Sequence, residues 1–407
     1  MAFDFSSSLS SRATGAALRW SGFPPYHFVG GNIDEPTVPA EELAATVQKV
    51  LKAEGHSMAK YGMNSGPQGY LPLREFIADN LGRRTQMQIG PEDVLITSGS
   101  LQAMELVYAA FLDPGDIVIL EDANYGGKIS RLRAVGAETV PIELDEGGMR
   151  MDRLREALQR LADDGKRAKY IYTIPTIQNP TGTIMSESRR RELLDLAAEF
   201  DVPVFEDDCY ADLIWSGKRP PAIYALDQDE RTVYCGTFSK TIAPALRVGY
   251  LVAPWSIMQH VLPLKTDAGS GALEQMVLAE YLPGHFDAHV DHILPVLKDK
   301  AEAMTAALDE HFGSAAEYLP PVGGIYLWVT LPEQVDTRKL AAAAAGEGIA
   351  LNPGPEWTVN GEANKHRMRL CFGHPSVETI REGVAKLAEV CHREFGVPAR
   401  SANVARS

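Results

Sequence analysis

The chain has few cysteines, and their placement excludes two classes of small scaffold. Its 407 residues include four cysteines, and no two of them form a Cys-x-x-Cys pair. Such sparse spacing is not that of a disulfide framework or of a zinc site. We therefore expect free thiols in a reducing, cytoplasmic compartment. The four are Cys209, Cys235, Cys371 and Cys391.

Basic residues and long apolar runs are also scarce. The 39 Lys and Arg against 54 Asp and Glu give a net charge of −15 at pH 7. Because phosphate backbones bind to basic faces, we expect no nucleic-acid partner. Apolar runs such as Val107–Leu112 are too short to cross a bilayer, and residues 1–22 lack the apolar core of a secretion signal. No membrane partner is expected. His285, His289 and His292 fit a solvated helix face, so we expect no metal site.

From about residue 94 onward, short β-branched runs alternate with amphipathic stretches of helical length. This alternation predicts one large α/β domain around a mainly parallel sheet of about seven strands. The expected strands are Val94–Thr97, Ile117–Leu120, Thr139–Ile142, Tyr170–Ile174, Val202–Phe205, Thr232–Cys235 and Val248–Val252. The expected helices are Glu41–Glu54, Leu101–Leu112, Asp152–Ala162 and Glu187–Phe200.

After residue 252 the strand signal fades, and the remainder predicts a smaller α+β domain. A long helical stretch over Val290–Phe312 leads into a Pro/Gly cluster. The later elements are expected at Ile325–Thr330 (strand), Thr337–Glu347 (helix), Met368–Phe372 (strand) and Val377–Phe395 (helix).

Two segments have the residue types of an anion site and of a nucleophile. Thr97–Ser100 follows an expected strand and opens an expected helix, whose free N–H groups suit a phosphate. An ordinary N-cap at Ser100 explains the same residues. Gly236–Lys240 ends another strand, and Arg247 follows seven residues later. A lysine with a lowered pKa there would attack a carbonyl, but surface Lys and Arg at strand ends are the alternative.

Three further segments have polar side chains at or near expected strand ends. Glu206–Asp208 is an acidic run after Val202–Phe205, at the sheet edge where ligands bind in open α/β folds. Solvated acids are also common there. Asn179–Gly182 is explained by a turn alone. Arg367 and Arg369 share one strand face, and they either grip a carboxylate or line an exposed edge.

In this fixed order, the segments resemble one family over nearly the whole chain. The sequence is similar to fold-type I aminotransferases dependent on pyridoxal 5'-phosphate (PLP), of the aspartate aminotransferase superfamily. It is most like the branch of 2-aminoadipate, kynurenine and aromatic aminotransferases. The matching elements are Tyr61, Gly69–Arg74, Thr97–Ser100, Asn179–Gly182, Asp207 with Tyr210, Ser239-Lys240, Arg247–Tyr250, Gly323-Gly324 and Arg369.

The resemblance implies a reaction and a domain layout. An α-amino acid would give its amino group to the cofactor, and a 2-oxo acid would then receive it, in a ping-pong scheme. A large PLP-binding domain would span residues 51–288. A small domain would be formed by both termini, from residues 1–50 and 289–407.

The resemblance also implies the groups that act on the cofactor ring. Lys240 would form the Schiff base with PLP and carry the Cα proton. Asp207 would face the pyridine nitrogen and keep it protonated, so that the ring accepts electrons. Asn179 and Tyr210 would hydrogen-bond to the phenolic oxygen, and Tyr125 would stack on the ring.

The remaining implied contacts concern the phosphate and the substrate. Arg369 would bind the α-carboxylate, and Gly31 would contact the substrate through its backbone. Tyr61 would reach the phosphate from a neighbouring subunit, which implies a homodimer with shared active sites. The phosphate cradle would comprise Gly99, Ser100, Leu101 (through its main-chain N–H), Thr237, Ser239 and Arg247.

Departures from the family pattern concern mainly the substrate. Leu101 replaces the usual Gln, Cys209 replaces a Pro and Cys371 replaces an Asn. The loop Gly30–Pro36 also differs from the usual substrate-pocket loop, so the side-chain specificity stays open. Three aromatic residues either line a pocket for an aromatic or long aliphatic side chain or pack in the core. They are Trp20, Tyr26 and Trp357.

Two other functions use the same residues. The first is a different PLP reaction at Cα or Cβ, such as a lyase, decarboxylase or oxidase-like reaction. The second is a non-catalytic protein on this scaffold, such as the DNA-binding regulators of this branch. Retention of Lys240, Asp207 and Arg369 argues against the second, as does the acidic net charge.

Overall fold

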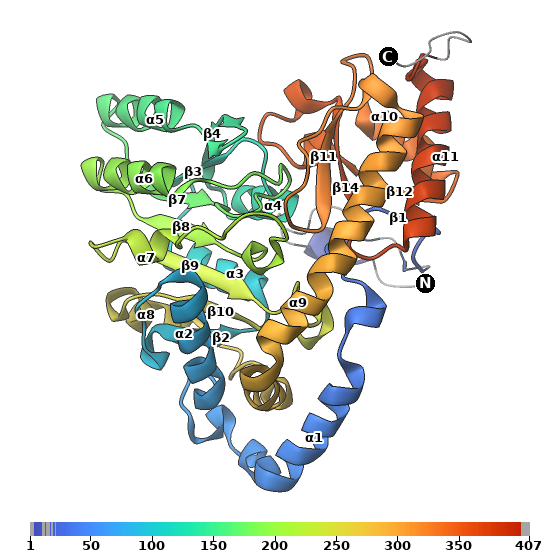
Figure 1. Ribbon diagram of the computed structural model, residues 1–407. Coiled ribbons are helices and arrows are strands. Elements are labelled where there is room, and N and C mark those ends of the chain that lie inside the picture. The colour runs from blue at the N-terminus through green and yellow to red at the C-terminus, as the bar shows by residue number, and fades with distance from the viewer. Residues whose placement is uncertain (1–3, 10–12, 14–16, 18, 21, 400–407) are drawn as a thin grey trace.

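The computed structural model describes residues 4–9, 13, 17, 19–20 and 22–399. These residues form a large α/β region beside a smaller α+β region, as Figure 1 shows. The fold class predicted from the sequence is therefore confirmed. The large region contains the seven-stranded sheet, and the small region contains strands and helices from both ends of the described chain.

The central sheet has the strand order β2-β10-β9-β8-β7-β3-β4. Strand β10 is antiparallel to both of its neighbours, and every other pair in this sheet is parallel. The strands are β2 (Val94–Thr97), β3 (Ile117–Glu121), β4 (Glu138–Ile142), β7 (Ala168–Thr173), β8 (Val204–Asp207), β9 (Thr232–Thr237) and β10 (Gly249–Val252). All seven match the runs expected from the sequence to within two residues at each end.

Helices cover both faces of this sheet, because its strands are apolar on both sides. In β3, Ile117 and Ile119 face the core under α5 and α6, whereas Val118 and Leu120 face the core under α3 and α4. Figure 1 shows α5 and α6 stacked beside the strands. The helices of this region are α2 (Leu71–Thr85), α3 (Ser100–Phe111), α4 (Gly126–Ala134), α5 (Met151–Asp163), α6 (Glu187–Glu199), α7 (Ile223–Leu226) and α8 (Trp255–Val261).

The small region is built on a three-stranded antiparallel sheet in the order β11-β14-β13. A parallel pair, β1 and β12, brings residues near position 26 beside residues near position 349. These elements share one apolar core with α10 and α11. Their bounds are β1 (Tyr26–His27), β11 (Tyr326–Thr330), α10 (Thr337–Ala345), β12 (Ile349–Ala350), β13 (Asn352–Pro353), β14 (Arg367–Cys371) and α11 (Val377–Phe395).

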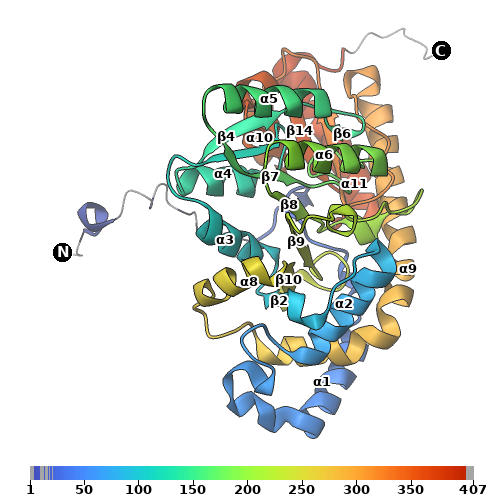
Figure 2. The same cartoon turned by 90° about the vertical axis from the view of Figure 1, so that its left-hand side faces the viewer.

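One long helix, α9 (Ala272–His311), runs from the large region into the small one, as Figure 2 also shows. The sequence predicted only its second half, Val290–Phe312, and the structure adds the turns from Ala272 onward, with Pro283 and Pro295 both inside the helix. Burial on both sides outweighs the lost backbone hydrogen bonds. The first half of α9 packs with α2 and with α1 (Ala40–Glu54), and its last turns pack in the core of the small region.

The two expected domain boundaries, 50/51 and 288/289, fall inside α1 and α9. Each boundary therefore cuts through a continuous helix, not through a linker between two domains. The division into domains stays a prediction. Within the described part of the chain, no helix combines the length and the apolar character needed to cross a membrane.

Candidate active site

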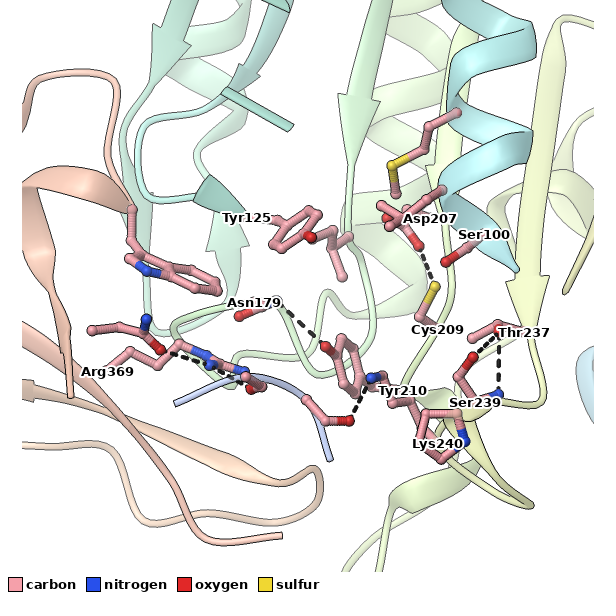
Figure 3. Close-up of a pocket in the computed structure, with 18 of the residues that line it drawn as sticks. Ser100, Tyr125, Asn179, Asp207, Cys209, Tyr210, Thr237, Ser239, Lys240 and Arg369 are labelled. Atoms are coloured by element: carbon pink, nitrogen blue, oxygen red, sulfur yellow. Dashed lines mark hydrogen bonds between the residues drawn. The ribbon is translucent and has the colours of Figure 1, made fainter. Parts of the chain in front are cut away.

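A cavity of ≈ 360 Å³ lies where the carboxyl ends of β7, β8 and β9 meet the small region. This is the edge at which open α/β sheets bind ligands, and the volume suits a cofactor-sized molecule. Figure 3 shows polar side chains around it, with Arg369 at one end and Thr237 and Ser239 at the other. Its lining is Gly30, Gly31, Ser100, Leu101, Met104, Tyr125, Ile174, Asn179, Asp207, Cys209, Tyr210, Thr237, Ser239, Lys240, Pro244, Arg247, Asn352, Trp357 and Arg369.

The lysine after β9 projects into this cavity. Lys240 Nζ donates a hydrogen bond to the carbonyl oxygen of Gly31, at 2.6 Å. A Cβ on residue 31 would lie 2.5 Å from Nζ, so only glycine leaves room for the amine there. Burial lowers the pKa of Lys240 below that of an ordinary lysine. A larger share of the amine is therefore neutral and nucleophilic near neutral pH.

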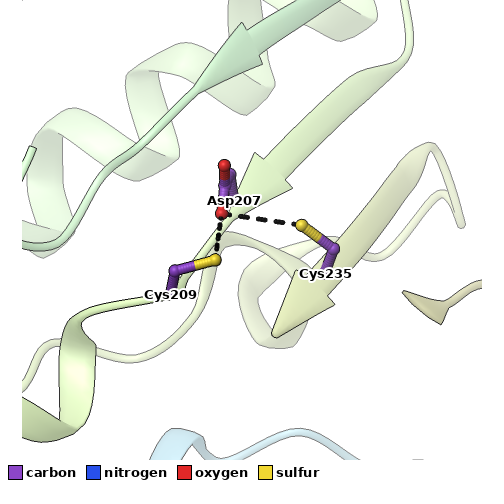
Figure 4. A group of neighbouring side chains, drawn as sticks. All are labelled: Asp207, Cys209 and Cys235. Carbon is purple, nitrogen blue, oxygen red and sulfur yellow. Dashed lines mark hydrogen bonds between the residues drawn. The ribbon is translucent and has the colours of Figure 1, made fainter. Parts of the chain in front are cut away.

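The carboxylate at the end of β8 is fully enclosed and accepts three hydrogen bonds. Cys209 Sγ donates to Asp207 Oδ1 at 2.8 Å, and Cys235 Sγ lies 3.6 Å from the same oxygen. Figure 4 shows both thiols directed at the same carboxylate oxygen. Tyr172 donates its hydroxyl to Oδ2 at 2.5 Å. Burial raises the pKa of Asp207, and these donors oppose that shift by stabilising the ionised form.

The ligand atoms of Asp207, Cys209 and Cys235 lie within 4.8 Å of one another, a spacing that also suits a metal ion. The sequence does not show this grouping, because the cysteines are far apart along the chain. Metal binding to cysteine requires thiolates. Burial raises the pKa of Cys235 well above its ordinary value and keeps it a thiol. The cluster therefore acts as a pair of donors to the carboxylate.

An anion cradle lies at the N-terminus of α3, where free N–H groups and the helix dipole favour negative charge. Arg247 closes one side, and its Nη2 donates to the Ser98 carbonyl at 3.0 Å. Thr237 Oγ1 lies 2.9 Å from Ser239 Oγ. Gly249 allows the close packing, because a Cβ there would lie 2.6 Å from the backbone nitrogen of Ser100.

Two buried polar groups have bonding capacity left for a bound molecule. Asn179 Nδ2 donates to the Tyr210 hydroxyl at 3.4 Å, while Asn179 Oδ1 is buried with no partner among the described residues. Buried polar atoms are rarely left unpaired, so this oxygen and the neighbouring hydroxyl fit a polar group inside the cavity.

Arg369, on β14, is a buried guanidinium without a carboxylate partner among the described residues. Its Nη1 donates to the Gly30 carbonyl at 3.0 Å and to Asn352 Oδ1 at 3.2 Å, and its Nε has no partner. The rings of Tyr326 and Trp357 lie 4.4 and 4.5 Å from its guanidinium carbon. A buried cation held in this way retains donors for an incoming carboxylate.

The structure brings together twelve of the fourteen site residues expected from the sequence. The two outside the lining set are Gly99 and Tyr61. Gly99 is the residue directly before α3, where a Cβ would overlap the Arg247 guanidinium. Tyr61 is 90 % exposed and lines a different hollow. Of the three aromatic residues proposed for a side-chain pocket, only Trp357 lines the cavity. Trp20 is 80 % exposed, and Tyr26 hydrogen-bonds to Glu382 on α11.

Sequence reasoning missed several groups around the site. Tyr172, Cys235 and Asn352 contact predicted residues, but no motif marks them. Lys128 is fully buried behind Asp207, and its spacing with Ile129 and Leu132 on one helix face was the available signal. The expectation of three solvated histidines was wrong for His289, which is buried and bonds to the Thr241 carbonyl at 2.7 Å.

The fold and these side chains together define a fold-type I PLP enzyme. A model of the family described as aminotransferase class I and II matches residues 32–387, and the chain belongs to this family. The aromatic-amino-acid aminotransferase 1 of Thermococcus litoralis is 35% identical over 371 residues, which is 90% of this chain and 88% of that protein.

Two solved structures support the same assignment. The multiple substrate aminotransferase of Thermococcus profundus superposes with a TM-score of 0.89 at 33% identity, covering 97% of this chain and 100% of that one. The α-aminoadipate aminotransferase of Thermus thermophilus, complexed with N-(5'-phosphopyridoxyl)-L-leucine, gives a TM-score of 0.84 at 33% identity, over 91% and 93% of the two chains. The present chain is a PLP-dependent aminotransferase.

The residues of the cavity fit this cofactor. The cradle supplies donors for a phosphate, Lys240 supplies an amine for an aldehyde, and the unpaired Asn179 amide oxygen marks a polar contact inside the cavity. Asp207 supplies a buried negative charge at the end of a strand.

Proposed function

We propose that Lys240 links to the cofactor and carries the proton in both halves of a ping-pong transamination. The observation that supports this most is its placement. The amine lies in the same cavity as Asp207 and Arg369, and burial lowers its pKa. The cofactor supplies an electron-accepting ring that stabilises negative charge at the substrate Cα. Lys240 Nζ, when not bonded to the cofactor, would take the proton from the substrate Cα and pass it to the cofactor.

The substrate is oriented from the small region. Arg369 receives the α-carboxylate through its remaining N–H donors, and the rings of Tyr326 and Trp357 hold the guanidinium in place. Gly31 sets the position of Lys240 through its carbonyl oxygen and lies beside the entering substrate. This arrangement fixes the Cα proton relative to Nζ, which contributes to the rate through orientation.

The remaining lining residues hold the cofactor. Asp207 would keep the ring nitrogen protonated, Asn179 and Tyr210 would hydrogen-bond to the phenolic oxygen, and Tyr125 would stack on the ring. The N-terminus of α3 would hold the phosphate. The groups proposed for it are Gly99, Ser100, the main-chain N–H of Leu101, Thr237, Ser239 and Arg247.

Replacement of the lysine tests the proposal. Lys240→Ala should abolish turnover, and borohydride should no longer fix the cofactor to the protein. Arg247→Ala should mainly weaken cofactor retention, because it removes one charge from the phosphate cradle. Transamination yields 2-oxo acid without released ammonia, so stoichiometric ammonia would instead support elimination. Normal turnover by the Lys240→Ala protein would contradict the assignment.

We propose a homodimer with shared active sites, and the exposed position of Tyr61 supports it. Within its own chain this tyrosine is 90 % exposed and does not line the cavity. We infer that it reaches the phosphate of a second copy. The test mixes Lys240→Ala with Tyr61→Ala protein under conditions of subunit exchange. Half of the dimers would then be mixed, with one intact site each, so activity should return to about a quarter of wild type. No recovery would contradict sharing.

The amino donor is proposed to have an uncharged side chain. Every charged lining residue already has a proposed partner, whereas the other lining groups include Leu101, Met104, Ile174 and Trp357. A panel of aromatic, aliphatic, acidic and basic amino acids identifies the donor, with the absorbance of the cofactor measured after each addition.

We propose a cytoplasmic location, which the four free cysteines support.

A further inference from the structure

A buried lysine lies behind the active site in a cage of aromatic rings. Lys128, in the first turn of α4, is fully buried. Its Nζ lies 3.8 Å from the ring centre of Tyr172, 4.5 Å from that of Tyr108, 4.8 Å from that of Phe205 and 5.1 Å from that of Tyr170. Its one hydrogen-bond partner among the described residues is the Tyr170 hydroxyl, at 3.5 Å.

The nearest of these rings joins the lysine to the catalytic carboxylate. Nζ of Lys128 stands over the face of Tyr172, and the hydroxyl of the same ring donates to Asp207 Oδ2 at 2.5 Å. A cation over the face of a phenol withdraws electron density and makes the hydroxyl a stronger donor. The positive charge and the hydroxyl therefore act on Asp207 in the same direction, towards the ionised form.

The surroundings of Lys128 set the pKa of its amine. Burial lowers the pKa of Lys128 to about 7. The nearby acids offset only part of the effect of burial, and the four ring faces also favour the ammonium ion. The titratable groups that face Lys128 come from five neighbouring elements. They are Glu105 and Tyr108 on α3, Glu121 on β3, Tyr170 and Tyr172 on β7, Asp207 on β8 and Cys235 on β9.

A purely structural role does not account for this arrangement. An apolar side chain of similar length would fill the same space without the cost of desolvating an amine, and such replacements of buried ions are often neutral or stabilising. The position also has no direct ion-pair partner among the described residues. What a lysine adds here is positive charge next to Asp207, which burial otherwise drives towards the neutral acid.

We propose that Lys128 is a positioning residue for transamination. As an ammonium ion held by the aromatic cage, it keeps Asp207 ionised and Tyr172 donating to it, and thereby keeps the cofactor ring nitrogen protonated. This inference rests on the proposed role of Asp207 opposite that nitrogen. The matching prediction is that loss of the Lys128 charge lowers the pKa of the ring nitrogen by about one unit, the lower end of the range for a nearby charge.

The test uses the holoenzyme with PLP labelled with ¹⁵N in its ring. The ¹⁵N chemical shift reports protonation of that nitrogen between pH 6 and 9. Lys128→Met should lose protonation at lower pH than wild type, and Lys128→Arg should restore most of the wild-type profile. The matched control is Lys169→Met, which removes a partly exposed lysine from β7 that pairs with Asp116. This control should leave the profile unchanged.

Coupling between residues identifies the route. If Lys128 acts through Tyr172, then Tyr172→Phe should shift the profile in the same direction. The double variant should shift it by less than the sum of the two single variants. If the shift of the double variant equals the sum of the two single shifts, the Lys128 charge acts on Asp207 independently of Tyr172. That result would overturn the proposed role of Tyr172 in the route.

The Asp207→Asn variant distinguishes a failure of the Lys128 inference from a failure of the proposed role of Asp207. If Asp207→Asn leaves the ring nitrogen unchanged, the proposed role of Asp207 fails. If Asp207→Asn shifts the profile and folded Lys128→Met does not, the Lys128 inference is overturned and the function stands. If Lys128→Met does not fold, the charge of Lys128 is measured directly by NMR on wild-type protein labelled with ¹⁵N-lysine. A charged Lys128 Nζ at pH 6 supports the inference, and a neutral amine there overturns it.

Discussion

The arginine proposed to bind the substrate carboxylate gives the sharpest quantitative test. Arg369→Lys keeps a positive charge at the same place but replaces a planar fork of donors with a single ammonium. In the wild type, Arg369 Nη1 donates hydrogen bonds to the Gly30 carbonyl and to Asn352 Oδ1, and Nε has no partner among the described residues. A lysine cannot hold those two acceptors and also receive both oxygens of a carboxylate.

The expected loss follows from the hydrogen bonds given up. A hydrogen bond to a charged group contributes about 1.5–3 kcal/mol, and losing one of the two to the carboxylate should lower kcat/KM by about 10- to 150-fold. The side chain is 1 % exposed, so solvent offers little compensation. The absorbance of the bound cofactor should not change, because Arg369 has no proposed contact with it.

The assay compares an amino acid with the amine that lacks its carboxylate. Single-turnover bleaching of the cofactor is measured with both substrates for wild type and for Arg369→Lys. The preference for the amino acid should shrink by the same factor as kcat/KM. The matched control is Arg367→Lys, two residues away on the same strand and outside the cavity lining. A loss of less than threefold, or an equal loss with the amine, would refute the reasoning.

Two further predictions concern a close contact and a buried acid. Gly31→Ala places a Cβ 2.5 Å from Lys240 Nζ and should lower kcat by about 100-fold through misplacement of the amine, whereas Gly284→Ala, with open space around it, should leave kcat unchanged. Burial raises the pKa of Glu121 to about 7, so the folded protein binds a proton more tightly than the unfolded chain. Wild type should therefore lose up to about 3 kcal/mol of stability relative to Glu121→Gln as the pH rises from about 4.5 to about 7, measured by denaturant unfolding. A constant difference across that range would contradict it.

Much of the sheet and most of the site were predictable from local patterns. Buried parallel strands are apolar on both faces, so runs such as Ile117–Leu120 stand out from the helices around them. Asp207, Asn179 and Lys240 lie at or just after strand ends, and such residues meet at one edge of the sheet. Their motifs carry the family resemblance, which supplied the roles that spacing alone leaves open.

What could not be predicted depends on contacts between distant segments. Cys235 and Tyr172 act on Asp207 from neighbouring strands, and nothing in their local sequence indicates it. Lys128 occupies a helix turn where a solvated lysine is the ordinary expectation, and only tertiary packing encloses it. The start of α9 was missed because it is held by packing against α1 and α2, which are distant in the sequence. The contact proposed for Tyr61 involves a second copy of the chain.

The long helix α9 also has a consequence for how the protein unfolds. Its first half is buried in the core of the large region, its middle contributes Ile293 and Leu297 to the core beside the cavity, and its last turns are buried in the small region. Neither region can lose its packing without exposing part of the same helix. The two regions are thus thermodynamically coupled, and calorimetry should record one cooperative melting transition rather than two independent ones.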